Sequence, residues 1–173
     1  MVNDKLTDVE RIIQQITGQL PRTLFVIAGP SGAGKNTIIK KLMTNNVYLD
    51  RVRTFTTRSP REGETNGDQY RFVTHDQFRE LAAAGKLMEV DGQDVYGLGD
   101  LYSMPGDIYG DIAPTKHLVV AEVDIHGTRR LRAVYPDCTT IFVTASPEIL
   151  AQRVQTRADN IMDAKNLAQR MQT

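Results

Sequence analysis

One short segment constrains the fold of this chain more than any other: a glycine-rich turn between an apolar run and a helical pattern. Residues 23–28 form an unbroken apolar run without alternation, which is typical of a strand buried on both faces. A helix is predicted over residues 35–43, because Ile38, Ile39 and Leu42 share one face. The turn between them reads Gly29-Pro30-Ser31-Gly32-Ala33-Gly34-Lys35 and fits the pattern G-x-x-x-x-G-K.

This pattern, in its frame of strand and helix, predicts a phosphate-binding loop. Glycines let successive backbone N–H groups point at phosphates, the helix N-terminus adds a positive dipole end, and Lys35 reaches the outer phosphates. The alternative is a glycine-rich turn that binds nothing. Asn36 departs from the pattern, because Ser or Thr usually offers a hydroxyl to Mg²⁺ there, although Thr37 follows immediately. Direct metal ligation is therefore more in doubt than nucleotide binding.

The other elements are predicted from apolar periodicity and from helix caps. Strands are expected at 51–57, 70–73, 117–124 and 139–145, and helices at 7–20, 75–84, 128–134 and 147–157. Residues 117–124 and 139–145 are again interpreted as continuous apolar runs, and Thr74 with Gln77 suits a capping box. Residues 91–116 predict loop with one short helix. Because strands and helices alternate, we expect an α/β fold with a parallel sheet covered by helices on both faces.

Composition excludes several classes of protein. The 21 basic residues balance 21 acidic ones, which argues against a protein that binds nucleic acid through a broad positive field. The single cysteine, Cys138, cannot form an internal disulfide, and no apolar run approaches the roughly 18 residues of a membrane span. Residues 1–20 lack the apolar block of a secretory signal. The chain is therefore expected to be cytoplasmic, with no membrane partner and no metal-ligand motif of its own.

A second cluster suited to phosphate follows the first. Residues 54–64 read Thr-Phe-Thr-Thr-Arg-Ser-Pro-Arg-Glu-Gly-Glu, which places the guanidinium groups of Arg58 and Arg61 three residues apart beside several hydroxyls. Residues 66–73, Asn-Gly-Asp-Gln-Tyr-Arg-Phe-Val, come next. With these two segments in this order, the chain resembles a guanylate kinase, the enzyme family that moves the γ-phosphate of ATP to GMP. The resemblance runs from Thr23 to Arg170.

The resemblance implies a role for several residues. Arg58, Arg61 and Tyr70 match the positions that hold the GMP phosphate, and residues 29–37 match the ATP-binding loop. Glu89 matches the carboxylate that reads guanine, which is physically apt because a carboxylate only accepts and guanine offers two adjacent donors. Three further matches are a base-facing hydroxyl, an aromatic residue and a strand-end carboxylate: Thr54, Tyr102 and Asp124.

The match is looser around Tyr102-Ser103-Met104-Pro105. This segment is favoured over Tyr96-Gly97-Leu98 as the counterpart of the family's Tyr-Gly-Ser/Thr segment, because it lies at the expected distance before Asp124 and keeps the following proline. Met104 then replaces the family's second hydroxyl, which weakens the case for full guanine selectivity. Ser103 is a possible substitute.

The C-terminal part matches the family's lid. Arg153 and Arg157 lie one helical turn apart and Arg170 follows, and these three, with Lys35 and Arg58, are the catalytic residues that the resemblance implies. Mg²⁺ is expected with ATP, held largely through water.

The expected architecture is a P-loop kinase sandwich of three layers in a single domain over residues 1–173. It has an N-terminal helical extension over 1–20, a GMP-binding subdomain over 51–107 and a lid over 151–170. The family's last strand and closing helix are expected to be missing, either because the chain is a fragment or because the domain has one edge strand fewer.

Two other functions stay open from the sequence. One is a related P-loop kinase that acts on a phosphorylated sugar, and the other is an inactive guanylate-kinase-like module that binds phosphopeptides. The oligomeric state is not predicted.

Overall fold

A four-stranded parallel sheet forms the centre of the molecule. The computed structural model describes residues 21–61, 63–88 and 99–159, so the helix expected at 7–20 lies outside the described residues. The strand order is β2-β6-β1-β7, and every pair is parallel. The strands are β1 (Thr23–Ala28), β2 (Leu49–Arg51), β6 (Leu118–Glu122) and β7 (Thr139–Phe142).

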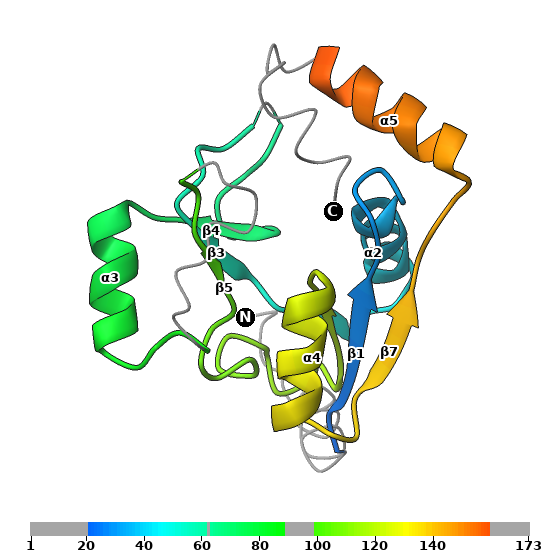
Figure 1. Cartoon of the computed structure of the whole chain (residues 1–173). Coiled ribbons are helices and arrows are strands. Elements are labelled where there is room, and N and C mark those ends of the chain that lie inside the picture. Colours follow the sequence, from blue (N-terminus) through cyan, green and yellow to red (C-terminus); the bar gives the residue numbers. More distant parts are fainter. Residues whose placement is uncertain (1–20, 62, 89–98, 160–173) are drawn as a thin grey trace, which may run out of the picture.

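Two helices cover opposite faces of this sheet, as the alternation of strands and helices predicts. Helix α2 (Lys35–Asn45) packs through Ile39 onto Ile27 and Val120. Helix α4 (Ile125–Val134) packs through Leu131 onto Val26 and its neighbours on the other face. Neighbouring strand residues therefore face different helices, which explains why β1 has no polar face. Figure 1 shows both helices against β1.

A second, smaller sheet lies to one side of the first (Figure 1). Its order is β4-β3-β5, with β3 (Thr54–Thr56) parallel to β4 (Tyr70–Phe72) and antiparallel to β5 (Tyr102–Ser103). Helix α3 (His75–Ala83) covers it, and Phe55, Phe78 and Leu87 form a separate small core. The capping box expected of Thr74 and Gln77 is present at the start of α3.

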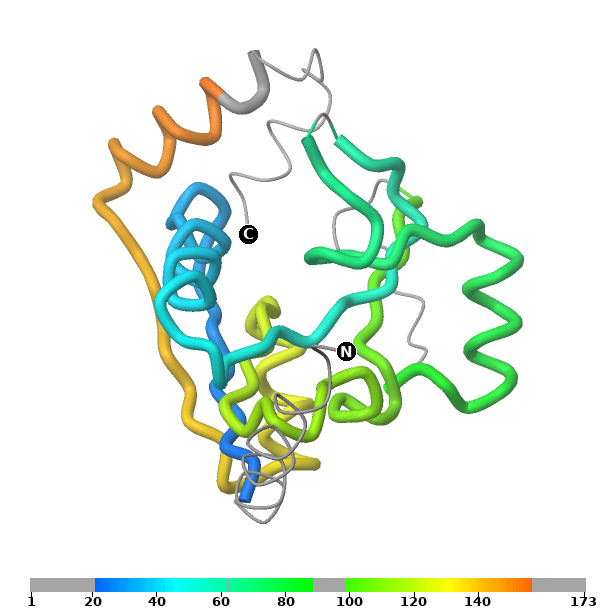
Figure 2. The backbone as a smooth tube through the Cα atoms, turned by 180° about the vertical axis from the view of Figure 1, so that it is seen from behind, coloured from blue at the N-terminus to red at the C-terminus, as the bar shows by residue number. Residues whose placement is uncertain are grey.

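The single strand expected at 51–57 is wrong, because two strands in different sheets occupy this segment. The Val52 N–H still donates to the carbonyl of Val120 in the central sheet, at 2.9 Å. The Arg53 side chain then turns back to Asp50 and to the carbonyl of Arg51, and β3 begins at Thr54 in the small sheet. This crossing joins the two sheets, as Figure 2 shows from behind.

The short helix expected within 91–116 is absent from its described part, residues 99–116. Strand β5 and a series of separate turns stand there instead. Three of these turns close through backbone bonds three residues apart, at Gly110, Ile112 and Lys116, and none continues into a helix. Ile108 and Ile112 are nevertheless buried in the main core.

The C-terminal elements differ from expectation in two ways. Helix α4 begins at Ile125 and not at residue 128, because Asp124 caps it. Strand β7 is exposed along its whole length, with Phe142 62% exposed, because it pairs with β1 alone among the described strands. Helix α5 (Pro147–Asp159) follows near its predicted bounds. Within the described ranges, no helix has the length and apolar character needed to cross a membrane.

Candidate active site

The phosphate loop is a tight turn whose backbone favours glycine at three positions. Gly29, Gly32 and Gly34 have φ angles of 148°, 82° and 89°, a region in which a side chain is strained. A Cβ atom on Gly29 would lie 1.9 Å from the carbonyl oxygen of Val143, so the loop leaves β1 too close to the end of β7 for any side chain. Gly34 caps α2, and this places the positive end of the helix at the loop.

The side chain of Lys35 folds over this loop. Its ammonium donates to the carbonyl oxygens of Gly29 at 2.8 Å and Pro30 at 3.1 Å. An ammonium has three donors on a flexible stem, so an arriving phosphate oxygen can exchange with one of these carbonyls without a change in the loop.

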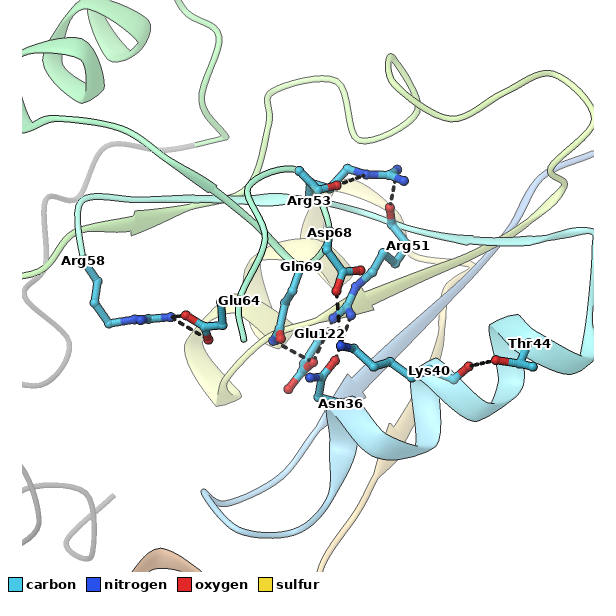
Figure 3. Close-up of polar contacts among 11 residues, drawn as sticks. Asn36, Lys40, Thr44, Arg51, Arg53, Arg58, Glu64, Asp68, Gln69 and Glu122 are labelled. Carbon is cyan, nitrogen blue, oxygen red and sulfur yellow. Dashed lines mark hydrogen bonds and ion pairs between the residues drawn. The ribbon is translucent and has the colours of Figure 1, made fainter. Parts of the chain in front are cut away.

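The residue after this lysine, Asn36, belongs to a polar network at the ends of β2 and β6 (Figure 3). Its Oδ1 accepts from Arg51 Nη1 at 2.8 Å, and Arg51 Nη2 donates to Glu122 Oε2 at 3.1 Å. Gln69, from the segment before β4, donates to the same Glu122 oxygen at 3.1 Å. The network therefore joins the phosphate loop to the segment that leads into the small sheet.

The small sheet brings the predicted acceptor residues together. Arg58 is buried just after β3, with its guanidinium carbon 5.3 Å from the ring centroid of Tyr70. The ring of Tyr102 meets that of Tyr70 edge-on at 6.2 Å. Thr54 lies on the same sheet and donates its hydroxyl to the sulfur of Met104 at 3.2 Å.

Glu64 is paired with one terminal nitrogen of Arg58, while the other, Nη1, donates to the carbonyl of Ser59 at 2.6 Å. Arg58 Nη2 donates to both oxygens of Glu64, at 3.0 and 2.9 Å, and the backbone N–H of Arg61 donates to Glu64 Oε2 at 2.8 Å. Figure 3 shows the pair at some remove from the Arg51 network. A carboxylate and a phosphate present similar oxygens to an arginine side chain, so an arginine that pairs with Glu64 is also suited to a phosphate.

This pairing shifts the pKa of both groups. Burial alone would lower the pKa of Arg58, but the hydrogen bond to Glu64 and nearby negative groups raise it overall. Burial alone would raise the pKa of Glu64, yet the hydrogen bonds from Arg61 and Arg58, with the positive charge of Arg58, bring it below its ordinary value. Both groups are therefore ionised at neutral pH.

One cavity of about 880 Å³ extends from the phosphate loop to the residues of the small sheet. This volume is in the range of small-molecule sites. Many of the residues predicted from the sequence line it: Gly29, Ser31, Gly32, Ala33, Gly34, Lys35, Asn36, Thr37, Thr54, Arg58, Arg61, Tyr70, Tyr102, Asp124 and Arg153. Pro30 belongs to the loop but is not among the lining residues.

Helix α5 contacts the phosphate loop. Arg153 Nη1 donates to the carbonyl of Gly32 at 3.1 Å, and Val154 lies against the same glycine. Of the other predicted lid residues, Arg157 falls in α5 without a described side chain. Arg170 lies outside the described residues, as does Glu89, the predicted guanine reader.

Asp124 and Ser103 also have structural partners in addition to their place on the cavity. Asp124 Oδ1 accepts from the Gly127 N–H at 2.7 Å and so caps α4. Ser103, the possible substitute for the missing hydroxyl, lines the cavity and donates to the carbonyl of Met104 at 3.1 Å.

Several cavity residues were missed from the sequence: Glu64, Gln69, Glu122, His126 and Arg130. A signal existed only for Glu64, a carboxylate six residues after Arg58 in a turn that contains Gly63. Gln69 and Glu122 meet across 53 residues of chain, and no local pattern indicates such a contact. Arg51 contacts Asn36 and Glu122, but nothing in the sequence distinguishes it from other residues of the predicted strand.

Comparison with known proteins agrees with this geometry. The family model described as "Guanylate kinase" matches residues 21–173. The guanylate kinase of Nitrosomonas europaea is 36% identical over 138 residues, 79% of this chain and 67% of that protein. That of Trichormus variabilis is 34% identical over 150 residues, 86% of this chain and 72% of that protein.

The fold also has a counterpart among solved structures. The crystal structure of guanylate kinase from Anaplasma phagocytophilum superposes with a TM-score of 0.62 at 22% identity, over 84% of this chain and 72% of that one. At this identity the likeness concerns the fold alone. The family model and the two sequence relatives go further, and by them this chain belongs to the guanylate kinase family.

Proposed function

We propose that this chain transfers the γ-phosphate of ATP to the phosphate of GMP. The observation that carries the proposal is the single cavity that Lys35 lines from one side and Arg58, with Tyr70, from the other. A phosphoryl transfer between nucleotides needs a donor and an acceptor phosphate held in line, and little covalent chemistry from the protein. On one side of this cavity Lys35 would hold the donor phosphate, and on the other Arg58 with Tyr70 would hold the acceptor phosphate.

The donor half is the phosphate loop. Its backbone amides and the N-terminus of α2 would hold the ATP phosphates, and Lys35 would exchange a loop carbonyl for an oxygen of the transferring group. Arg153 already contacts this loop through Gly32, so its guanidinium is close enough to the phosphates to stabilise the charge that develops there. Arg157 and Arg170 are proposed to join it from the lid.

The acceptor half is the small sheet. Arg58, Arg61 and the Tyr70 hydroxyl would hold the GMP phosphate, with Glu64 and the Ser59 carbonyl fixing the orientation of the Arg58 guanidinium. Glu89 is proposed to accept from guanine, with Thr54, Tyr102 and Asp124 around the nucleotide. The sulfur of Met104, which stands where the family has a second hydroxyl, accepts from the hydroxyl of Thr54. Selectivity for guanine therefore depends more on Glu89 than on these two residues.

Mg²⁺ is proposed to enter with ATP. Glu122 and Asp124 are the carboxylates that line the cavity beside the phosphate loop, and they suit a hydrated ion held through water. When bound, the ion would neutralise phosphate charge. The subdomain at 51–107 and the lid at 151–170 are proposed to close on the substrates and exclude water, since an open site would hydrolyse ATP.

A coupled assay of ADP formation tests this function. GMP, AMP and ribose 5-phosphate are each offered with ATP, and we expect turnover with GMP alone. Lys35→Ala should lower kcat at least about a hundredfold, because it removes a charge that stabilises the transition state. Preference for ribose 5-phosphate would favour a sugar-phosphate kinase, and GMP binding without any ATP binding would favour a phosphopeptide module.

A further inference from the structure

The buried arginine beside the phosphate loop is the feature that the proposed reaction leaves unexplained. Arg51 ends β2 and its side chain is only 2% exposed. It does not line the cavity, yet its two terminal nitrogens contact two residues that do, Asn36 and Glu122. Its Nε is buried with no hydrogen-bond partner among the described residues. A buried guanidinium with an unsatisfied N–H costs stability, so packing alone does not account for it.

The contact with Arg51 determines which way the Asn36 amide faces. A guanidinium has only donors, so the Asn36 atom at 2.8 Å from Nη1 must be the carbonyl oxygen. The amide nitrogen is on the opposite branch of the same planar group. Asn36 lines the cavity, and within the described part of the chain its only side-chain bond is the one to Arg51.

The same contact removes Asn36 from the possible metal ligands. The residue at this place in phosphate loops usually offers a hydroxyl oxygen to Mg²⁺. The only oxygen of the Asn36 side chain already accepts from a cation, which makes it a poor direct ligand for a second one. The residues present therefore do not fit direct ligation at this position.

We propose that Arg51 is a positioning residue that turns the Asn36 amide so that its N–H₂ group donates to a phosphate oxygen of ATP. This inference rests on the proposed function, in that ATP binds at the phosphate loop. Asn36 then contributes a hydrogen bond to the nucleotide where other phosphate loops contribute a ligand to the metal. As a result, part of the ATP affinity of this chain is independent of Mg²⁺.

The test measures ATP affinity by calorimetry, in EDTA and in Mg²⁺, for the full chain and its variants. The wild type should bind ATP in EDTA, and Asn36→Ala should weaken that binding about tenfold or more, as expected for a lost hydrogen bond to a charged group. Binding by the wild type in Mg²⁺ only, or an unchanged affinity in Asn36→Ala, would overturn the proposal.

A double-mutant cycle tests the role of Arg51. Arg51→Met should also weaken ATP binding in EDTA, and the double variant with Asn36→Ala should bind no worse than about twofold below Asn36→Ala alone, because there is then no amide to orient. Additive losses would overturn the positioning role. If Arg51→Met fails to fold, Arg51→Lys replaces it, since a single ammonium does not reproduce the fork that spans Asn36 and Glu122.

Arg53→Met is the matched control. It removes the same kind of side chain two residues away, where the partners are Asp50 and two backbone carbonyls, and should leave ATP affinity unchanged. GMP affinity is measured in parallel. A wild type that binds GMP but no ATP in either buffer contradicts the proposed function itself, whereas a wild type that binds ATP and an inert Asn36→Ala contradicts only this inference.

Discussion

Arg58 and Glu64 illustrate how a carboxylate orients a buried arginine at the proposed acceptor site. The arginine is buried, and one of its terminal nitrogens donates to a carboxylate from its own turn. That carboxylate also accepts a hydrogen bond from the backbone N–H of Arg61. Glu64 therefore orients the side chain of Arg58 and fixes the backbone at Arg61. An acceptor phosphate would find the Arg58 guanidinium already desolvated and oriented, which reduces the ordering cost of binding.

Replacement of this carboxylate should make stability depend less on pH. Glu64→Gln is expected to lower the free energy of unfolding by about 1–2 kcal/mol at pH 7, because it removes a charge-assisted pair. The pKa of Glu64 is lowered in the folded state from its usual 4.5. The contribution of the pair is therefore fully present above pH 4.5 and is lost as the pH falls through the folded pKa.

Urea unfolding of both proteins at a series of pH values measures this dependence. The difference in stability between wild type and Glu64→Gln should be constant from pH 7 to about 5 and shrink below 4.5. A difference that stayed constant down to pH 3 would contradict the pairing. Asp76→Asn is a suitable control, because its ion pair with Arg79 is highly exposed and should contribute little at any pH.

At the scale of elements, the start of α4 combines a structural cap with a face of the cavity. Asp124 accepts from Gly127, and Asp124, His126, Gly127 and Arg130 all line the cavity. The helix therefore begins three residues earlier than its apolar pattern predicts. This early start brings its first turn to the carboxyl end of the parallel strands, where ligands bind in such sheets.

The two roles of Asp124 can be separated by substitution. Asp124→Asn keeps an oxygen for the Gly127 N–H and should change stability by less than about 0.5 kcal/mol, whereas Asp124→Ala should cost about 1 kcal/mol. If the carboxylate also contacts GMP, both variants should raise the KM for GMP at least about fivefold. Thermal unfolding and steady-state kinetics measure these effects. An Asp124→Asn protein with the wild-type KM would exclude a contact between Asp124 and GMP.

At the scale of the whole molecule, the two sheets carry the two proposed phosphate sites separately. The central sheet carries the phosphate loop, the small sheet carries Arg58 and its neighbours, and the crossing between β2 and β3 joins them (Figures 1 and 2). Each sheet has its own hydrophobic cluster. The main core also includes Met104, directly after β5, so the two sheets are in contact through it.

Ligand-induced stabilisation should therefore separate into two independent parts. At a hundredfold excess over Kd, each nucleotide should add about 2.7 kcal/mol to stability. Lys35→Ala should abolish most of the increment from ATP and keep that from GMP, and Arg58→Ala should do the reverse, each relative to its own ligand-free protein. Thermal shift measurements with each nucleotide would show this. Loss of both increments in either variant would contradict the division between sheets.

The sequence by itself determined the features that depend on neighbouring residues. The phosphate loop, the strand before it, the helix after it and the cap of α3 are local, since each follows from residues a few positions apart. The guanylate kinase family could also be identified, because its motifs occur along this chain in the family's order. Burial was less predictable: residues 23–28 and 139–145 were both interpreted as buried strands, but only the sheet order makes one strand central and leaves the other at an edge.

Only the tertiary structure decided which polar groups meet. Arg51 contacts Glu122 across 71 residues of sequence, and it contacts Asn36 across 15. Neither distance corresponds to a helical or strand period. These groups converge because parallel strands end at one edge of the sheet, and that edge forms only when β2 and β6 pair. A hydrogen bond tolerates a change of only a few tenths of an ångström in its donor–acceptor distance. The packing of the chain sets that distance, and the order of residues does not.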